Sequence, residues 1–120
     1  MTMPRVIVES PYAGRGNVLD RNIDFAWNCV LDCLSRGEAP FASHLFYTTP
    51  LDDTVPAQRA LGIECGLTWM SVCDYVVVYT DNGITSGMQK GIDYAAKCGK
   101  PVVMRSLAQS NADAAQSATT

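Results

Sequence analysis

Short apolar runs alternate along this chain with longer segments in which apolar residues recur at helical spacing. The most continuous run is Tyr75–Tyr79, and an unbroken apolar run of this length is typical of a strand buried on both faces of a parallel sheet. We predict further strands near residues 5–9, 39–43 and 101–104. The segment at 39–43 is the weakest of them, because Pro40 favours an edge strand or a strand start.

Three segments between these runs have the spacing of amphipathic helices. The first covers residues 18–36 and the third covers residues 86–98. The second follows a long loop at 44–54 and has Pro56 in its first turn. Strands that alternate with helices predict parallel, right-handed crossovers. We therefore expect an α/β fold of about four parallel strands, of the Rossmann-like or flavodoxin-like kind, with helices on both faces of the sheet.

Three loops follow the carboxyl ends of the predicted strands, at residues 10–17, 44–54 and 80–86. In open parallel sheets the ligand crevice lies beyond these ends, where the strand order reverses. We expect the loops to converge there and to form the ligand site. The candidate ligand-binding residues on and beside them are Ser10, Pro11, Tyr12, Arg15, His44, Gly83, Ser86, Gly87 and Met88.

These residue types favour an anionic ligand that carries a ring. The start of the helix after the clearest strand attracts an anion through its free N–H groups and its dipole. Arg15 can pair with a phosphate or carboxylate, and Tyr12 can stack on a ring. Structural roles stay open for the same positions, since Thr85 or Ser86 can cap the helix and Arg15 can lie in a solvated turn.

The net charge, the lengths of the apolar runs and the residue counts argue against several classes of binding partner. Its net charge is −3 and no basic stripe appears, so we do not expect a nucleic-acid polymer as partner. No apolar run approaches the roughly 20 residues that span a membrane, and the N-terminus has no signal-peptide core, so we expect a cytoplasmic protein. We expect no cofactor and no metal, because His44 is the only histidine and Cys29 and Cys33 fit core positions.

The five cysteines all fall in predicted helices, and their odd number suits reduced thiols. We assign residues 1–105 to one domain. Residues 106–120 are mostly Ala, Ser, Gln and Thr without periodicity, and we expect a disordered or frayed tail. Four large aromatic residues in so small a chain predict a homodimer or a higher homo-oligomer. They are Trp27, Phe46, Tyr47 and Trp69.

The order and spacing of several short motifs resemble the nucleoside 2-deoxyribosyltransferase superfamily, which includes nucleotide N-glycosidases, and in particular its small bacterial and phage members. The resemblance covers roughly residues 6–103. Its motifs are Ser10-Pro11-Tyr12 after the first strand, the strand Tyr75–Tyr79, Ser86-Gly87-Met88 through Tyr94-Ala95, and Gly99-Lys100-Pro101-Val102.

The resemblance implies a Rossmann-like domain that cleaves the bond between a base and a (deoxy)ribose, in oligomers whose sites a neighbour completes. A carboxylate on the helix after the central strand, usually Glu, would attack the anomeric carbon. That Glu lies four residues before the alanine that matches Ala95, and here the position is Gly91. Among nearby carboxylates Asp81 is the better substitute and Asp93 the poorer one, although Asp81 also fits a turn and Asp93 a solvated helix face.

Two functions remain open. Gly91 favours a protein that binds or sequesters a nucleotide or a nucleotide-derived signal without turning it over. The resemblance favours an active N-glycosidase or 2-deoxyribosyltransferase that uses another carboxylate, with Asp81 as the candidate catalytic residue. Both functions need a small, nucleotide-like ligand.

Overall fold

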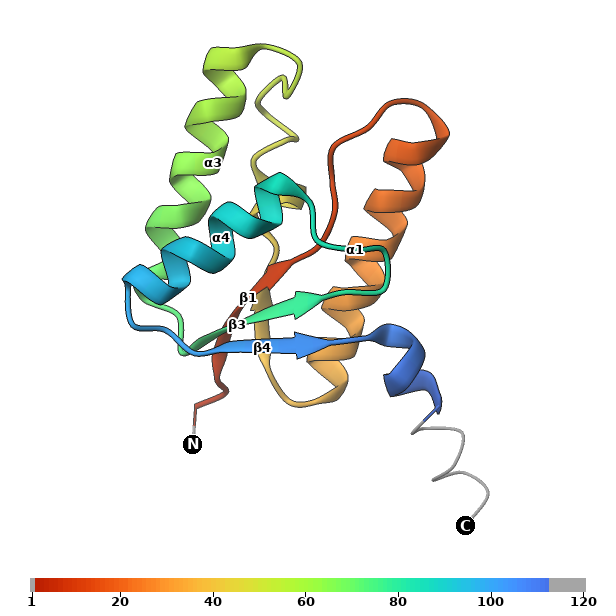
Figure 1. Ribbon diagram of the computed structural model, residues 1–120, viewed down its shortest axis with the longest axis vertical. Helices are drawn as coiled ribbons and strands as arrows, with labels where there is room; N and C mark the ends of the chain where they lie inside the picture. The colour runs from red at the N-terminus through yellow and green to blue at the C-terminus, as the bar shows by residue number, and fades with distance from the viewer. Residues whose placement is uncertain (1, 113–120) are drawn as a thin grey trace.

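Four strands form one parallel sheet at the centre of the molecule (Figure 1). The structure is a computed structural model that describes residues 2–112. The strand order is β2-β1-β3-β4, and all three pairings are parallel, which confirms the predicted α/β fold. The strands are β1 (Arg5–Glu9), β2 (Ala39–Phe41), β3 (Tyr75–Tyr79) and β4 (Val102–Arg105). Only β2 is shorter than predicted, since a short helix starts two residues after it.

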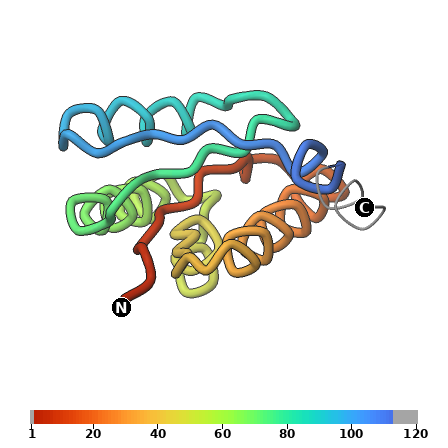
Figure 2. The backbone as a smooth tube through the Cα atoms, turned by 90° about the horizontal axis from the view of Figure 1, so that it is seen from below, coloured from red at the N-terminus to blue at the C-terminus, as the bar shows by residue number. Residues whose placement is uncertain are grey.

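Among the described residues, the helices that flank the sheet include α1 (Asn17–Ser35), α2 (Ser43–Phe46), α3 (Pro56–Met70) and α4 (Ser86–Lys97). The side chains of α1 pack on one face, and those of α3 and α4 pack on the other. Figure 2 shows α1 and α4 on opposite sides of the strands. Helices on both faces were predicted, whereas α2 was not: it begins at Ser43, the last residue of the predicted strand at 39–43, and continues into the predicted loop at 44–54. No helix of the part described is both long and apolar enough to cross a membrane.

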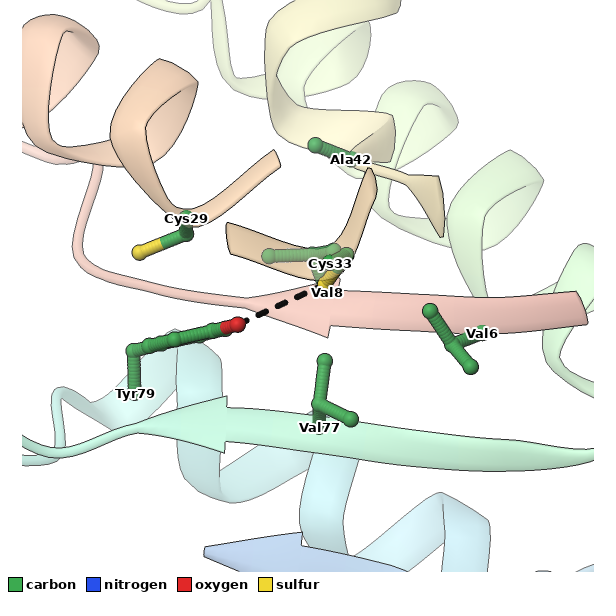
Figure 3. Packing of buried hydrophobic residues seen from close by; sticks show 7 residues of the cluster. All are labelled: Val6, Val8, Cys29, Cys33, Ala42, Val77 and Tyr79. Carbon is green, nitrogen blue, oxygen red and sulfur yellow. Dashed lines mark hydrogen bonds between the residues drawn. The ribbon is translucent and has the colours of Figure 1, made fainter. Parts of the chain in front are cut away.

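The face that carries α1 packs small helix residues against large strand residues (Figure 3). Cys29 and Cys33 are fully buried, as expected for core positions. They lie against Val8 and Val77, and Cys33 Sγ is 3.4 Å from the hydroxyl of Tyr79. Small side chains at these positions let α1 approach the sheet closely.

The helical spacing of apolar residues within 18–36 predicts Trp27, Leu31 and Leu34 among the core residues of α1, and this prediction is wrong. Trp27, Leu31 and Leu34 are at least half exposed, whereas the smaller Ala26, Cys29 and Cys33 face the core. The helix is therefore rotated so that its bulkiest apolar side chains point away from the sheet. Two predicted cysteine positions are also wrong, because Cys73 follows α3 and Cys98 follows α4. All five cysteines are free thiols.

The segment after β4 is anchored rather than frayed as far as the structure describes it. Residues 107–112 form a helical turn, and the Asp81 carboxylate accepts hydrogen bonds from the backbone N–H groups of Leu107 and Ala108 at 2.9 and 3.0 Å. The Ser106 hydroxyl donates to the same carboxylate at 3.0 Å. The expected frayed tail is therefore wrong for residues 106–112, and residues 113–120 of that prediction lie outside the described residues.

Candidate functional site

A cleft opens at the carboxyl edge of the sheet, between the end of β1, helices α2 and α3, and the N-terminus of α4. The chain leaves β1 toward β2 on one side, while β3 pairs on its other side, so the strand order reverses beside β1. Ligand crevices of open α/β sheets lie at this point. The polar and charged residues that line the cleft include Glu9, Ser10, Tyr12, His44, Asp53, Arg59, Ser86 and Lys90.

A neutral histidine forms one wall of the cleft. Burial lowers the pKa of His44 to about 4, so its ring is uncharged at neutral pH. Its Nε2 and the hydroxyl of Ser10 share a hydrogen bond at 2.8 Å. The ring of Tyr12 meets the imidazole edge-on, with the ring centroids 5.9 Å apart. The Ser10 hydrogen bond and the Tyr12 contact hold the imidazole in a fixed orientation at the end of β1.

The carboxyl group of Glu9 is the most perturbed acid of the cleft. Glu9 is the last residue of β1 and is partly buried. Across residues 2–112, no hydrogen bond or ion pair reaches its side chain. Burial raises the pKa of Glu9 from 4.5 to about 8. The group therefore carries a proton at neutral pH and is available as a hydrogen-bond donor in the cleft.

Gly91 makes room for this carboxyl group. The glycine is buried on α4, where the helix crosses the end of β1. A Cβ atom built on Gly91 would lie 2.6 Å from Cδ of Glu9 and closer still to Oε1. No side chain fits at position 91 while Glu9 keeps its place. The Glu9 carboxyl thus occupies the space that a side chain at position 91 would enter.

The first turn of α4 supplies backbone donors at the opposite side of the cleft. Thr85 is the N-cap, and its hydroxyl accepts a hydrogen bond from the N–H of Met88 at 3.2 Å. The sequence left the choice between Thr85 and Ser86 open, and the structure assigns the cap to Thr85. The first N–H groups of a helix have no partners within the helix, so those of Ser86 and Gly87 suit an anion.

Three charged residues of the cleft were not predicted from the sequence. Asp53 and Arg59 form an ion pair at 2.6 Å beside the start of α3. Lys90 lies one residue before Gly91 on α4, and no ion pair of the described chain involves it. In the sequence, Arg59 and Lys90 look like ordinary basic residues on the solvent-facing side of a helix. Only the fold shows that both line the cleft.

The cleft brings together six of the predicted binding residues and leaves the others outside. Ser10, Tyr12, His44, Ser86, Gly87 and Met88 line it. Pro11, Arg15, Gly83 and Asp81 are not among its lining residues. Arg15 and Gly83 are exposed in the loops at either side.

Asp81, the predicted catalytic residue, has a structural contact instead. Although burial opposes the effect, hydrogen bonds from Ala108, Leu107 and Ser106 hold the pKa of Asp81 below its usual value. The carboxylate is engaged as the cap of the turn at 107–112. The structure therefore places the predicted carboxylate away from the cleft and places Glu9, which the sequence analysis missed, inside it. An acidic residue that directly ends an apolar strand was the available signal.

Sequence comparison assigns the chain to a family without an assigned function. The pattern of that family matches residues 4–105, which is most of the chain. This chain belongs to the family described as domain of unknown function DUF7768. No curated protein matches the chain.

Two solved structures have similar folds. The 2-deoxyribosyltransferase of Bacillus psychrosaccharolyticus has a TM-score of 0.66 at 14% sequence identity, covering 85% of this chain and 72% of that chain. The CMP N-glycosidase of Clostridium botulinum has a TM-score of 0.49 at 13% identity, covering 85% of this chain and 68% of that chain. At the level of the fold, the first similarity confirms what the sequence resemblance implied.

Proposed function

We propose that this DUF7768 domain binds a nucleoside or nucleotide in the cleft at the carboxyl edge of its sheet. The observation that carries the proposal is the convergence of an aromatic and imidazole wall with a helix N-terminus in one cleft. The shared fold with a 2-deoxyribosyltransferase that is described as a biocatalyst for nucleoside synthesis supports the same ligand class.

Each end of such a ligand has a matching partner. Phosphate or ribose oxygens would accept hydrogen bonds from the first turn of α4 and contact the ammonium group of Lys90. The base would lie toward Tyr12 and His44, whose rings offer flat apolar surface and hydrogen-bonding nitrogen atoms. The unpartnered Glu9 carboxyl would face the middle of the ligand.

Calorimetry with purine and pyrimidine nucleosides and their monophosphates tests the proposal. Lys90→Ala should weaken the binding of a monophosphate about tenfold and leave the binding of the nucleoside nearly unchanged, because only the phosphate needs the charge. Lys97→Ala is the matched control, since Lys97 is exposed at the far end of the same helix. If no compound of the panel binds, or if both lysine variants behave alike, the proposed site is wrong.

Cleavage of the ligand is the second candidate function. The absence of a carboxylate at position 91 argued for binding alone. The Glu9 carboxyl, which lies where a side chain of residue 91 would lie, argues for an N-glycosidase or a 2-deoxyribosyltransferase.

The proposal includes a cytoplasmic homo-oligomer. The free state of all five cysteines supports a reducing compartment. Trp27, Leu31 and Leu34 form an exposed apolar row on α1 that supports a subunit contact. Light scattering at micromolar concentration checks this part, because a mass of 13.0 kDa would identify a monomer and contradict it.

A further inference from the structure

We propose that Glu9 is the proton donor of a glycosidic-bond-cleaving site, and that Gly91 is the position that admits its carboxyl group to the cleft. This inference rests on the proposed binding of a nucleoside or nucleotide. It assigns the reacting carboxyl group to the end of β1 rather than to α4 or to the loop of Asp81.

The backbone fixes the position of Glu9. In the parallel pairing of β1 with β3, Glu9 is the register partner of Val78, so its Cα atom is held by the two inner strands. The carboxyl group extends under Gly91, and both residues line the cleft. A group held on a strand in this way is more precisely placed than one on a loop.

A structural role does not explain this carboxyl group. A carboxyl group with a structural role has hydrogen-bond or ion-pair partners in the protein. Glu9 has neither a hydrogen bond nor an ion pair within the described part of the chain. A perturbed, unpartnered acid that lines a cleft is the kind of group found at functional sites.

The surroundings keep the group protonated. Burial raises the pKa of Glu9 to about 8, which suits an acid that must hold its proton near neutral pH. The cations of the cleft do not pair with it, since Arg59 is engaged by Asp53. The titratable and charged groups that line the cleft from the neighbouring elements are Tyr12, His44, Tyr47, Asp53, Arg59 and Lys90.

The step follows from a protonated acid beside a bound nucleoside. The Glu9 O–H gives its proton to a base nitrogen while the bond between the anomeric carbon and the base breaks, and the electron pair of that bond goes to the base. Water adds to the anomeric carbon and releases a proton, which returns to Glu9. The net reaction is nucleoside plus water giving free base plus sugar, with no other reactant.

The experiment compares Glu9→Gln with Glu64→Gln in the full chain. Glu64→Gln removes an exposed carboxylate of α3 and is the matched control. Released base is measured by chromatography on the nucleoside and monophosphate panel, and affinity is measured separately by calorimetry. Glu9→Gln should lower the rate of base release about 100-fold or more, with affinity within a few-fold of the wild type, and Glu64→Gln should change neither.

The pH profile of the wild type gives a second readout that needs no variant. Base release should fall as pH rises through about 8, because Glu9 then loses the proton that it must donate. A rate that rises with pH over this range would overturn the assignment, as would base release that persists in Glu9→Gln. Binding without any base release by the wild type would overturn this inference alone, whereas absence of binding would overturn the proposed function itself.

Discussion

Glu38 and Glu9 are both shielded from solvent, fully and in part, but they differ in their hydrogen-bond partners and in the direction of their pKa shifts. Glu38 is 3% exposed, and both of its oxygens accept hydrogen bonds from the Arg105 guanidinium, at 2.7 and 2.6 Å. The Tyr75 hydroxyl donates a further hydrogen bond to it. Although burial opposes the effect, hydrogen bonds from Arg105 and Tyr75 hold the pKa of Glu38 below its usual value. Glu9 has no such partners, and its pKa is raised to about 8.

The difference shows how one side-chain type serves two purposes. The charge of Glu38 is neutralised by Arg105, and both of its oxygens accept hydrogen bonds from that side chain. The ion pair joins the residue before β2 to the last residue of β4 and leaves no oxygen free for a ligand. Around Glu9 no described residue bonds the carboxyl oxygens, and the side chain faces the cleft, so these oxygens are free to bond with water or with a ligand. The structural glutamate and the glutamate of the proposed binding site therefore lie on opposite faces of the sheet.

The largest effect should come from removing the charge of Glu38. Glu38→Gln leaves the guanidinium of Arg105 buried without a counter-charge, and we expect it to lower the free energy of unfolding by about 3–5 kcal/mol. Glu9→Gln should raise stability at pH 7, because the amide is neutral in both states whereas Glu9 must take up a proton on folding. Urea unfolding of both variants measures the contrast, and equal losses would contradict it.

The next effect should come from adding a methyl group at position 91. Gly91→Ala places Cβ against the Glu9 carboxyl, which is the end of a flexible side chain and can turn away, so the substitution should cost no more than about 2 kcal/mol. Gly87→Ala is the matched control, because its Cβ would lie 3.9 Å from the nearest atom, Thr85 Oγ1, and it should be neutral or stabilising.

A double-mutant cycle locates the cause of that cost. In a Glu9→Ala background the cost of Gly91→Ala should largely disappear, since the atoms that crowd the new Cβ are gone. Additive costs would show that Gly91 is required for another reason.

The two glutamates should give the stability curve opposite slopes with pH. The pKa of Glu9 is raised from 4.5 to about 8. Its contribution to the free energy of unfolding is therefore fully present below pH 4.5 and is lost as pH rises through 8. The pKa of Glu38 is lowered, so its contribution is present above the usual pKa of the group and is lost as pH falls through the folded-state value.

Thermal unfolding at several pH values checks both signs. The melting temperature of Glu9→Gln minus that of the wild type should increase between about pH 4.5 and 8 and stay constant above this range. The deficit of Glu38→Gln should shrink toward acid pH. A difference in melting temperature between Glu9→Gln and the wild type that does not depend on pH would mean that the pKa of Glu9 is not raised in the folded protein.

The smallest effect should come from Asp81. Asp81→Ala removes the acceptor of the turn at 107–112 and should cost about 1 kcal/mol, as the loss of a helix cap does. Ligand affinity should not change, because Asp81 is outside the cleft. Urea unfolding measures the effect on stability and calorimetry measures the effect on ligand affinity. Weakened binding would show that Asp81 contributes to the binding site.

The fold could be predicted from the sequence because its signals are local. The apolar run Tyr75–Tyr79 and the helical periodicities each depend on neighbouring residues, and alternation alone then implies parallel crossovers. The core-facing side of α1 could not be predicted in this way. Hydrophobicity ranks Trp27 and Leu31 above Ala26, although the close approach of helix and sheet selects the small residue for the core.

The site could be predicted only in part for the same reason. Ser10 and His44 each follow a strand, so topology brings them together, and they do share a hydrogen bond. The environment of Glu9 depends on Gly91, which is distant in the chain and on another element. An acidic residue at the end of a strand is ordinarily solvated, and only the packed structure shows that this one is partly buried beside Gly91.

The pairing of β1 with β3 has a consequence for the synthesis of this protein. The first strand leaves the ribosome early, but its inner partner, the residues that cover Glu9, and the turn that follows β4 are all made later. Pairings between distant segments form slowly, and apolar strands that wait for their partners are prone to aggregate. A nascent chain that ends before α4 would therefore carry an ordinary, acidic Glu9 and no cleft. Glu9 would acquire its raised pKa only when nearly the whole domain has been translated and folded.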